Sequence, residues 1–184
     1  MEQQSGKRGV LWITRTAIFL ALLVVVQIST APLGNTIITG SAVNAILIIC
    51  VMICGLSSGL TIAMLSPVLA KLAGIGPLWM LIPFIILGNM VLVLIWHILG
   101  NKPFGKKEIV AYVAAAIVAA LAKFGVLYIG IVKIAVPFML DLKEMQAMVI
   151  STMFSVPQLI TALIGGLVAI TIVPAMKKAI KIND

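Results

Sequence analysis

Charged side chains are scarce in this sequence. Only 10% of the 184 residues are charged, whereas 62% are hydrophobic. Soluble domains usually have about a quarter of their residues charged, so this composition excludes an ordinary water-soluble globule. We therefore predict an integral membrane protein, with the lipid bilayer surrounding most of its surface.

Metal-binding side chains are equally few. Cys50 and Cys54 are the only cysteines, and His97 is the only histidine. The cysteines lie four residues apart in an apolar segment, where small packed core residues are the favoured interpretation and a metal or redox pair is the alternative. A single histidine cannot complete a metal site, and His97 follows Trp96 near a segment end, where an interfacial position explains it. We expect neither a metal nor a cofactor.

Acidic residues are absent from the hydrophobic segments. All five fall at segment ends or in loops: Glu2, Glu108, Asp141, Glu144 and Asp184. A proton-coupled pump usually carries a buried acid, so that class is disfavoured. The sequence also lacks a Walker A motif and therefore does not hydrolyse ATP itself. Without a nucleophile–base pair or a metal cluster, we do not expect an enzyme.

Uncharged hydrophobic runs of about 20 residues recur along the whole chain. They predict transmembrane helices, because a helix satisfies its own backbone hydrogen bonds in hydrocarbon, whereas barrel strands would alternate with period two. We predict an all-α fold, a single transmembrane domain over residues 1–184 with six spans at about 10–30, 42–54, 57–73, 78–99, 109–137 and 148–173. The start of the chain lacks the features of a removable signal peptide, so we expect the first helix to stay as an anchor.

The second and third spans are short, and Gly55 and Gly59 separate them only weakly. One long helix is the alternative, but it would be much longer than the 17 to 25 residues or so that a tilted span needs. A tight turn is therefore favoured. Residues 32–41, between the first two spans, carry no charge, and their Gly, Thr and Asn content predicts a re-entrant or lid-like segment over the bundle.

The distribution of Lys and Arg predicts the orientation, because these residues are retained on the cytoplasmic side. With six spans and the N-terminus inside, the outer ends carry only Lys71, Lys133 and Lys143. The inner segments carry more: Lys7, Arg8, Lys102, Lys106, Lys107, Lys177, Lys178 and Lys181, with Arg15 near the inner face. We therefore expect both termini to be cytoplasmic. This topology explains the net charge of +8 without nucleic-acid binding.

A lysine interrupts the fifth predicted span. Lys123 falls slightly beyond the bilayer midplane, among alanines that allow neighbouring helices to approach closely. A charge at this depth costs about 2.5 to 3.5 kcal/mol, so it usually faces the protein interior or a water-filled cavity. We predict a ligand contact for Lys123. A lysine that extends its amine to the outer interface, or that bonds helix-end carbonyls, is the alternative.

Polar side chains on three other spans fall at a similar depth. They are Asn44 on the second span, Asn89 and the interfacial Trp79 on the fourth, and Ser151, Ser155 and Gln158 on the sixth, where the i, i+4, i+7 spacing forms one stripe. The inner halves of these spans are mostly aliphatic, which is unexpected for a channel. The pattern predicts a cup open to the outside, although a single Asn or Gln more often bonds a neighbouring helix than a ligand.

The first span carries two small residues, Ala17 and Ala21, on one face, a spacing that permits a close helix crossing. Other notable stretches are Arg15-Thr-Ala17-Ile-Phe-Leu-Ala21, Thr39-Gly-Ser-Ala-Val-Asn44-Ala-Ile-Leu, Gly55, Ser66-Pro67, Pro83 and Gly88-Asn89. With six spans and a basic N-terminal segment, the chain resembles, over nearly its whole length, the substrate-binding S component of energy-coupling factor (ECF) vitamin transporters.

The resemblance implies a protein of the bacterial plasma membrane that captures a vitamin or vitamin precursor from outside. Such a component associates with a transmembrane coupling protein and two cytoplasmic ATPase subunits, and it topples in the membrane to release its cargo. The resemblance also implies that Ala17 and Ala21 contact the coupling protein. It places the pocket towards the outside, under the loop between the first two helices.

The expected pocket combines amides and hydroxyls with Lys123, and with Lys71 as a second lysine, but no acid. A lone buried ammonium needs an opposite charge or good hydrogen bonds. We therefore expect an anionic or strongly acceptor-bearing ligand, such as the carboxylate vitamins niacin or pantothenate, and a thiamine-like cation is disfavoured. An uncharged pyrimidine or pyridine alcohol, bound by a neutral Lys123, is the alternative.

A membrane scaffold or assembly subunit, whose polar groups only pair helices, is the competing function. In that case Lys123→Met would leave any binding almost unchanged and would raise the stability of the protein.

Overall fold

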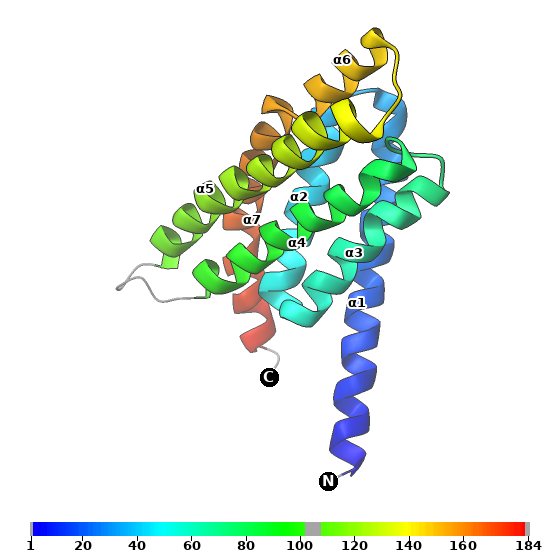
Figure 1. The fold of residues 1–184 in the computed structure, drawn as a ribbon. Coiled ribbons are helices and arrows are strands. Elements are labelled where there is room, and N and C mark those ends of the chain that lie inside the picture. The colour runs from blue at the N-terminus through cyan, green and yellow to red at the C-terminus, as the bar shows by residue number, and fades with distance from the viewer. Residues whose placement is uncertain (1, 102–107, 183–184) are drawn as a thin grey trace.

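The computed structural model describes residues 2–101 and 108–182, and this part of the chain is almost entirely helical (Figure 1). The α-helices are α1 (Glu2–Thr30), α2 (Thr36–Cys54), α3 (Leu56–Leu72), α4 (Ile82–Gly100), α5 (Glu108–Leu127), α6 (Glu144–Met153) and α7 (Val156–Ile182). Short 3-10 turns, η1 (Ala31–Leu33) and η2 (Trp79–Leu81), follow α1 and precede α4, and a π-helix, η3 (Tyr128–Met139), extends α5. The predicted all-α fold is confirmed.

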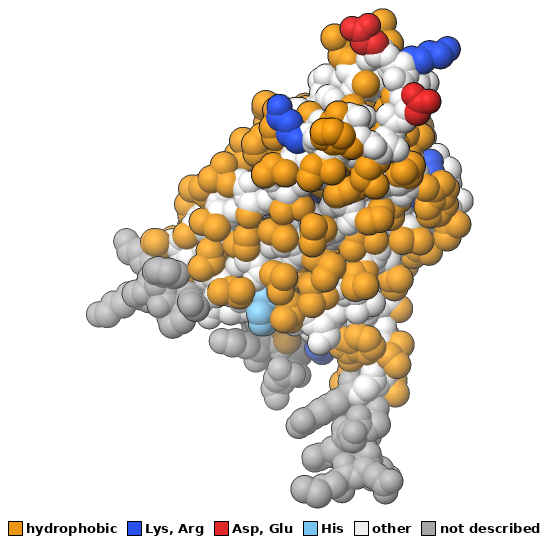
Figure 2. Space-filling model, viewed as in Figure 1, with side chains coloured by type: hydrophobic (Ala, Val, Ile, Leu, Met, Phe, Trp, Pro, Cys, Tyr) orange, Lys and Arg blue, Asp and Glu red, His pale blue; other side chains and the backbone are white. Residues whose placement is uncertain are grey.

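Five helical segments are long and apolar enough to cross a membrane, and α3 is a shorter apolar helix of 17 residues. Together they account for the six predicted spans. Hydrophobic side chains cover most of the face seen in Figure 2, and the acidic side chains on that face gather at the end where α6 lies. A surface of this kind stays in contact with lipid, so the fold is that of a membrane protein.

Both chain ends lie at the end of the bundle away from α6 (Figure 1), as an even number of crossings requires. Most of the basic residues that predict the orientation fall outside the described side chains: Lys7, Arg8, Lys102, Lys106, Lys107 and Lys181, as do the acids Glu2 and Asp184. The cytoplasmic location of the termini therefore stays a prediction.

Helix α2 begins earlier than the sequence indicated. Gly34 has φ 64°, a left-handed conformation that favours glycine, and Asn35 then caps α2 by accepting hydrogen bonds from the backbone nitrogens of Ile37 (2.9 Å) and Ile38 (3.4 Å). Residues 36–41 are therefore helical, and the prediction of a re-entrant or lid-like segment over 32–41 is wrong for them. At the other end of α2, Gly55 with φ 89° separates α2 from α3.

The last predicted span consists of two helices. α6 ends at Met153, Phe154 and Ser155 form a bend, and α7 begins at Val156. Pro157 lacks a backbone N–H, which is tolerated in the first turn of a helix but not in its interior, so a new helix starts here. As a result, Ser151 lies on α6 and Gln158 on α7, and the two do not share one helical face.

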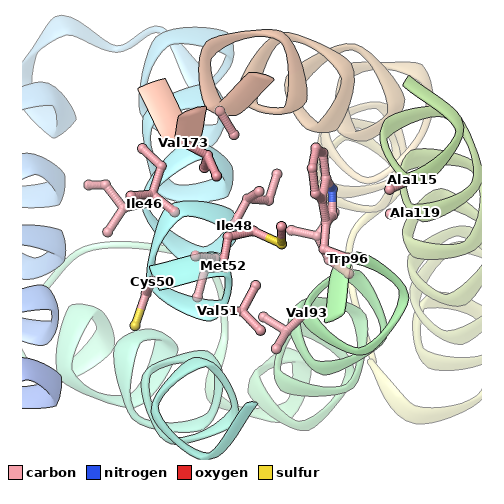
Figure 3. Packing of buried hydrophobic residues seen from close by; sticks show 14 of the residues in the cluster. Ile46, Ile48, Cys50, Val51, Met52, Val93, Trp96, Ala115, Ala119 and Val173 are labelled. Atoms are coloured by element: carbon pink, nitrogen blue, oxygen red, sulfur yellow. The ribbon is translucent and has the colours of Figure 1, made fainter. Parts of the chain in front are cut away.

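The main hydrophobic core occupies the half of the bundle nearer the chain ends, and a smaller cluster that includes Leu127 and Phe154 lies in the other half. Figure 3 shows Met52 of α2 and Trp96 of α4 pointing towards one another, with Ala115 and Ala119 of α5 beyond the indole. These alanines are fully buried, and their small size lets α5 lie close to α4. Cys50 is also fully buried in this cluster, in line with a packing role. The polar residues of the next section lie in the other half.

Candidate functional site

A cavity of about 460 Å³ lies in the half of the bundle away from the main core, and Leu127 and Phe154 of the smaller cluster are part of its wall. Its wall is formed by α1 to α5, by the loops that join α1 to α2 and α3 to α4, and by the junction of α6 and α7. Small-molecule sites usually measure about 300 to 1,000 Å³, so the cavity has the size of a ligand-binding pocket.

Lys123 lies in the wall of this cavity and is almost completely buried, with 4% of its surface exposed. Its Nζ donates hydrogen bonds to Oδ1 of Asn44 on α2 (2.6 Å) and to Oδ1 of Asn89 on α4 (2.7 Å). Both asparagines also line the cavity and are buried. One lysine on α5 thus joins three helices at the ligand-sized space.

No aspartate or glutamate is found among the described residues of the cavity wall. The two amide oxygens can accept hydrogen bonds from the Lys123 amine, but they carry no charge that would neutralise it. A buried charge without a counter-ion is costly. The wall therefore favours a ligand that brings a negative charge or strong acceptor atoms.

Donor groups next to Lys123 remain available to such a ligand. A protonated lysine has three N–H donors, and two of them serve Asn44 and Asn89. Asn89 uses its Oδ1 for Lys123, and its Nδ2 has no hydrogen-bond partner within the described chain. The third donor of Lys123 and the amide of Asn89 can together serve the two oxygens of one carboxylate.

The side chain of Asn44 is held in place by α7. Its Nδ2 donates to Oγ1 of Thr161 (3.3 Å), and the Thr161 hydroxyl in turn donates to the carbonyl of Gln158 (3.1 Å). Two glycines permit this contact: a Cβ on Gly165 would lie 2.6 Å from Cβ of Asn44, and one on Gly40 would lie 2.9 Å from Cγ2 of Thr161. The amide of Asn44 is thereby oriented with its oxygen towards Lys123.

Gln158 is the fourth of the sequence-predicted ligand residues that line the cavity. Its Nε2 donates to the carbonyl of Met153 (3.2 Å), which bridges the bend between α6 and α7. The structure therefore brings together Lys123, Asn44, Asn89 and Gln158, as the convergence of polar residues predicted.

The other four predicted ligand residues do not line the cavity. Trp79 is 52% exposed at the start of η2, and Lys71 is half-buried near the end of α3. Ser151 and Ser155 bond to each other across the α6–α7 bend, where the Ser155 hydroxyl donates to the Ser151 carbonyl. Lys71 and Ser151 thus lie on helices, Trp79 in η2 and Ser155 in the bend, all outside the cavity wall.

Sequence reasoning missed several polar residues of the wall: Gln27, Asn35, Thr36, Thr39 and Ser66. Gln27 is a polar residue near the end of the first apolar run, which was a usable signal. Serine and threonine give little signal, because their hydroxyls can bond the backbone of their own helix.

Ala17 and Ala21 are exposed on α1 and belong to a longer exposed stripe, Val10, Thr14, Ala17, Ala21, Val25 and Ile28, spaced by three or four residues. The opposite side of α1 is held against α3 by a buried hydrogen bond between the hydroxyls of Thr16 and Ser58 (2.8 Å). The small-residue face is thus turned away from the bundle.

These features define an all-helical membrane protein with a ligand-sized cavity, whose mainly apolar wall carries a few buried polar side chains. The family model described as ECF transporter, substrate-specific component, matches residues 12–176, nearly the whole chain, and the chain belongs to this family. Comparisons with curated proteins and with solved structures gave no significant match. Members of the family are substrate-binding components of transporters rather than enzymes, and they work with an ECF module.

Proposed function

We propose that this chain captures a vitamin or vitamin precursor that carries a carboxylate or a similar acceptor-rich group, and that it binds this group at Lys123 and Asn89. The observation that carries the proposal is the environment of Lys123, whose amine contacts only neutral amide oxygens in a cavity whose described wall has no acid. Family membership supports the capture role.

The charge of the site favours some vitamins over others. A carboxylate such as niacin or pantothenate supplies the negative charge that Lys123 lacks, and its two oxygens match the two free donors. A thiamine-like cation would place two positive charges together in a low-dielectric space and is disfavoured. An uncharged pyrimidine or pyridine alcohol fits only if Lys123 binds as a neutral amine.

The cavity lies in the half of the bundle away from the chain ends. With both termini in the cytoplasm, as the distribution of Lys and Arg predicts, the cavity faces outside and takes up its ligand there. The plasma membrane of a bacterium is the corresponding location, and delivery then requires a change of orientation driven by a partner.

The proposed partner is an ECF module of one transmembrane coupling protein and two ATPase subunits. Ala17 and Ala21 lie in the exposed stripe of α1, where small side chains let another helix approach closely. Because α1 is anchored to α3 through its other face, a partner can bind this stripe without disturbing the cavity.

A thermal-stability screen of the purified full chain in detergent tests the capture role. A ligand that binds only the folded protein stabilises it by RT ln(1 + [L]/Kd), about 2.7 kcal/mol at a hundredfold excess over Kd. We expect a carboxylate vitamin or precursor to raise the Tm of the wild type, and we expect Lys123→Met and Asn89→Ala to give a clearly smaller shift at the same ligand concentration.

Lys71→Met and Asn101→Ala are the matched controls, because both residues lie outside the cavity wall. They should keep the full ligand-induced shift. A shift of undiminished size in the Lys123 and Asn89 variants would leave the capture role intact and reject this site. A folded wild-type protein that responds to none of the compounds would contradict the capture role.

One observation favours the competing scaffold function. The Lys123 amine already bonds amides of two other helices, so the cluster can pair helices without any ligand. A scaffold with this helix-pairing cluster predicts that Lys123→Met loses stability and that no compound shifts the Tm of the wild type. The ligand proposal predicts a loss of ligand response instead.

A further inference from the structure

Two polar atoms beside the cavity have no hydrogen-bond partner among the described residues: Oε1 of Gln27 on α1 and Oγ of Ser66 on α3. Both atoms are buried, and Ser66 as a whole is 0% exposed. Hydroxyls in helices often bond the carbonyl four residues earlier, as Thr61 does with Ser57 (2.8 Å), but Ser66 makes no such bond. An unsatisfied buried polar group costs about 1 to 3 kcal/mol, so both atoms call for a polar partner.

Gln27 and Ser66 lie at a similar level in the bundle. The hydrogen bond between Thr16 and Ser58 aligns α1 with α3. Gln27 follows Thr16 by eleven residues (27 − 16) and Ser66 follows Ser58 by eight (66 − 58), so at a rise of about 1.5 Å per residue they lie about 16 Å and about 12 Å further along. The two side chains therefore reach the same cavity from neighbouring helices.

This pair lies on α1 and α3, two helices that do not pack extensively against α5, which carries Lys123. α1 packs against α2 and α3, whereas α5 packs against α4 and α7. Figure 1 shows α1 and α5 on opposite sides of the bundle. The cavity wall thus carries free donors at Lys123 on α5 and Asn89 on α4, and unpartnered oxygens at Gln27 on α1 and Ser66 on α3.

We propose that Gln27 and Ser66 form a second ligand subsite, which accepts hydrogen bonds from the far end of the ligand bound at Lys123. The proposal rests on the proposed function and narrows its substrate class. The ligand is an elongated molecule with a carboxylate at one end and a hydroxyl or amide N–H donor at the other. Oε1 of Gln27 is an acceptor, and the hydroxyl of Ser66 can accept or donate.

This class can be separated from other carboxylates with four probe compounds. Pantothenate carries hydroxyl and amide donors away from its carboxylate, and biotin carries ureido N–H donors. Nicotinate and lipoate are carboxylates without such donors. We expect the wild type to bind pantothenate or biotin more tightly than nicotinate or lipoate.

Titration calorimetry of the full chain in lipid nanodiscs, with Ser66→Ala and Gln27→Leu, tests the subsite. Each variant loses one hydrogen bond and should weaken the donor-bearing ligand about threefold to tenfold, while binding of nicotinate or lipoate stays as in the wild type. Ser57→Ala and Gln146→Leu are matched controls, because both residues are exposed and neither lines this cavity. Both should bind all four probes like the wild type.

Wild-type binding of only nicotinate or lipoate would contradict the subsite and leave the proposed function standing. Unchanged affinity of Ser66→Ala and Gln27→Leu for the donor-bearing ligand would also contradict the subsite, because the ligand would then make no hydrogen bond to either side chain. A folded wild type that binds none of the four contradicts the proposed function, and the subsite with it. If Ser66→Ala loses its thermal unfolding transition, Ser66→Cys, a residue of similar size and weak accepting power, replaces it.

Discussion

Oδ1 of Asn44 lies 2.6 Å from Nζ of Lys123, so an amide of α2 and a lysine of α5 are paired inside the bundle. Both side chains are buried, at 1% and 4% exposure. Each residue loses a close partner when the other is replaced, so the contribution of each to stability should depend on the presence of the other.

A double-mutant cycle measures this dependence. Lys123→Met leaves two buried amide oxygens without a donor, and Asn44→Leu removes one acceptor of a buried amine, so each change should destabilise the protein by about 1 to 3 kcal/mol. The double variant should lose less stability than the two single variants together, and the difference should be about 0.5 to 3 kcal/mol. Unfolding in detergent measures all four proteins. Additivity within about 0.5 kcal/mol would show that the pair is not coupled.

Thr161 should influence ligand binding without contacting the ligand group at Lys123. Thr161→Val keeps the shape of the side chain but removes the hydroxyl that holds Nδ2 of Asn44. We expect the Kd for the ligand to rise about threefold to tenfold, the equivalent of one hydrogen bond. Thr171→Val is the control, because its exposed hydroxyl bonds only its own helix, at the carbonyl of Val168 (2.8 Å). Equal binding by both variants would contradict the positioning role.

Two glycine substitutions should have opposite effects on stability. In Gly165→Ala the new Cβ would lie 2.6 Å from Cβ of Asn44 and 2.9 Å from the backbone of Ala45, so α7 must move away from α2. We expect a loss of about 1 to 3 kcal/mol. Gly125→Ala, in α5 close to Lys123, meets nothing within 4 Å and should gain up to about 1 kcal/mol. Thermal unfolding distinguishes these results, and an unchanged Tm for Gly165→Ala would contradict the close α2–α7 packing.

Bulky residues on α1 should separate partner binding from ligand binding. Ala17→Leu and Ala21→Leu enlarge the exposed face, which blocks a close helix crossing. We expect both variants to lose co-purification with an ECF module and to keep the ligand-induced Tm shift. Ala175→Leu, an exposed alanine on α7, should retain the module. Normal assembly by the two α1 variants would move the partner site to another surface.

The transmembrane helices could be predicted from the sequence, because the bilayer restricts which backbone structures can span it. Long uncharged runs can satisfy their backbone in lipid only as helices, and Gly55 marks a break because φ 89° favours glycine. The start of α2 could not be predicted this way. Gly40 has a low intrinsic helix preference, but here it lets α2 approach Thr161 on α7, and this tertiary contact outweighs the local preference.

The sequence predicted how far along each helix the site lies, but not which side of each helix lines it. Lys123, Asn44 and Asn89 were identifiable because a polar group inside the bilayer is costly and needs partners. Which side of a helix faces the cavity depends on packing angles that the sequence does not give. Lys71 lies on α3 but outside the cavity wall, and Trp79 lies in η2, before α4 begins. The predicted polar stripe of Ser151, Ser155 and Gln158 assumed one continuous helix. The bend before Pro157 instead leaves Ser151 on α6, Ser155 in the bend and Gln158 on α7.

The most direct test compares a carboxylate ligand with its neutral amide. The carboxylate that gives the largest Tm shift and its primary amide are each titrated into the wild type and into Lys123→Met in nanodiscs. A charged hydrogen bond contributes about 1.5 to 3 kcal/mol, so Lys123→Met should weaken the carboxylate about tenfold to hundredfold and the amide much less. An equal loss for both ligands, or none, would contradict the claim that Lys123 binds the anionic group of the captured molecule.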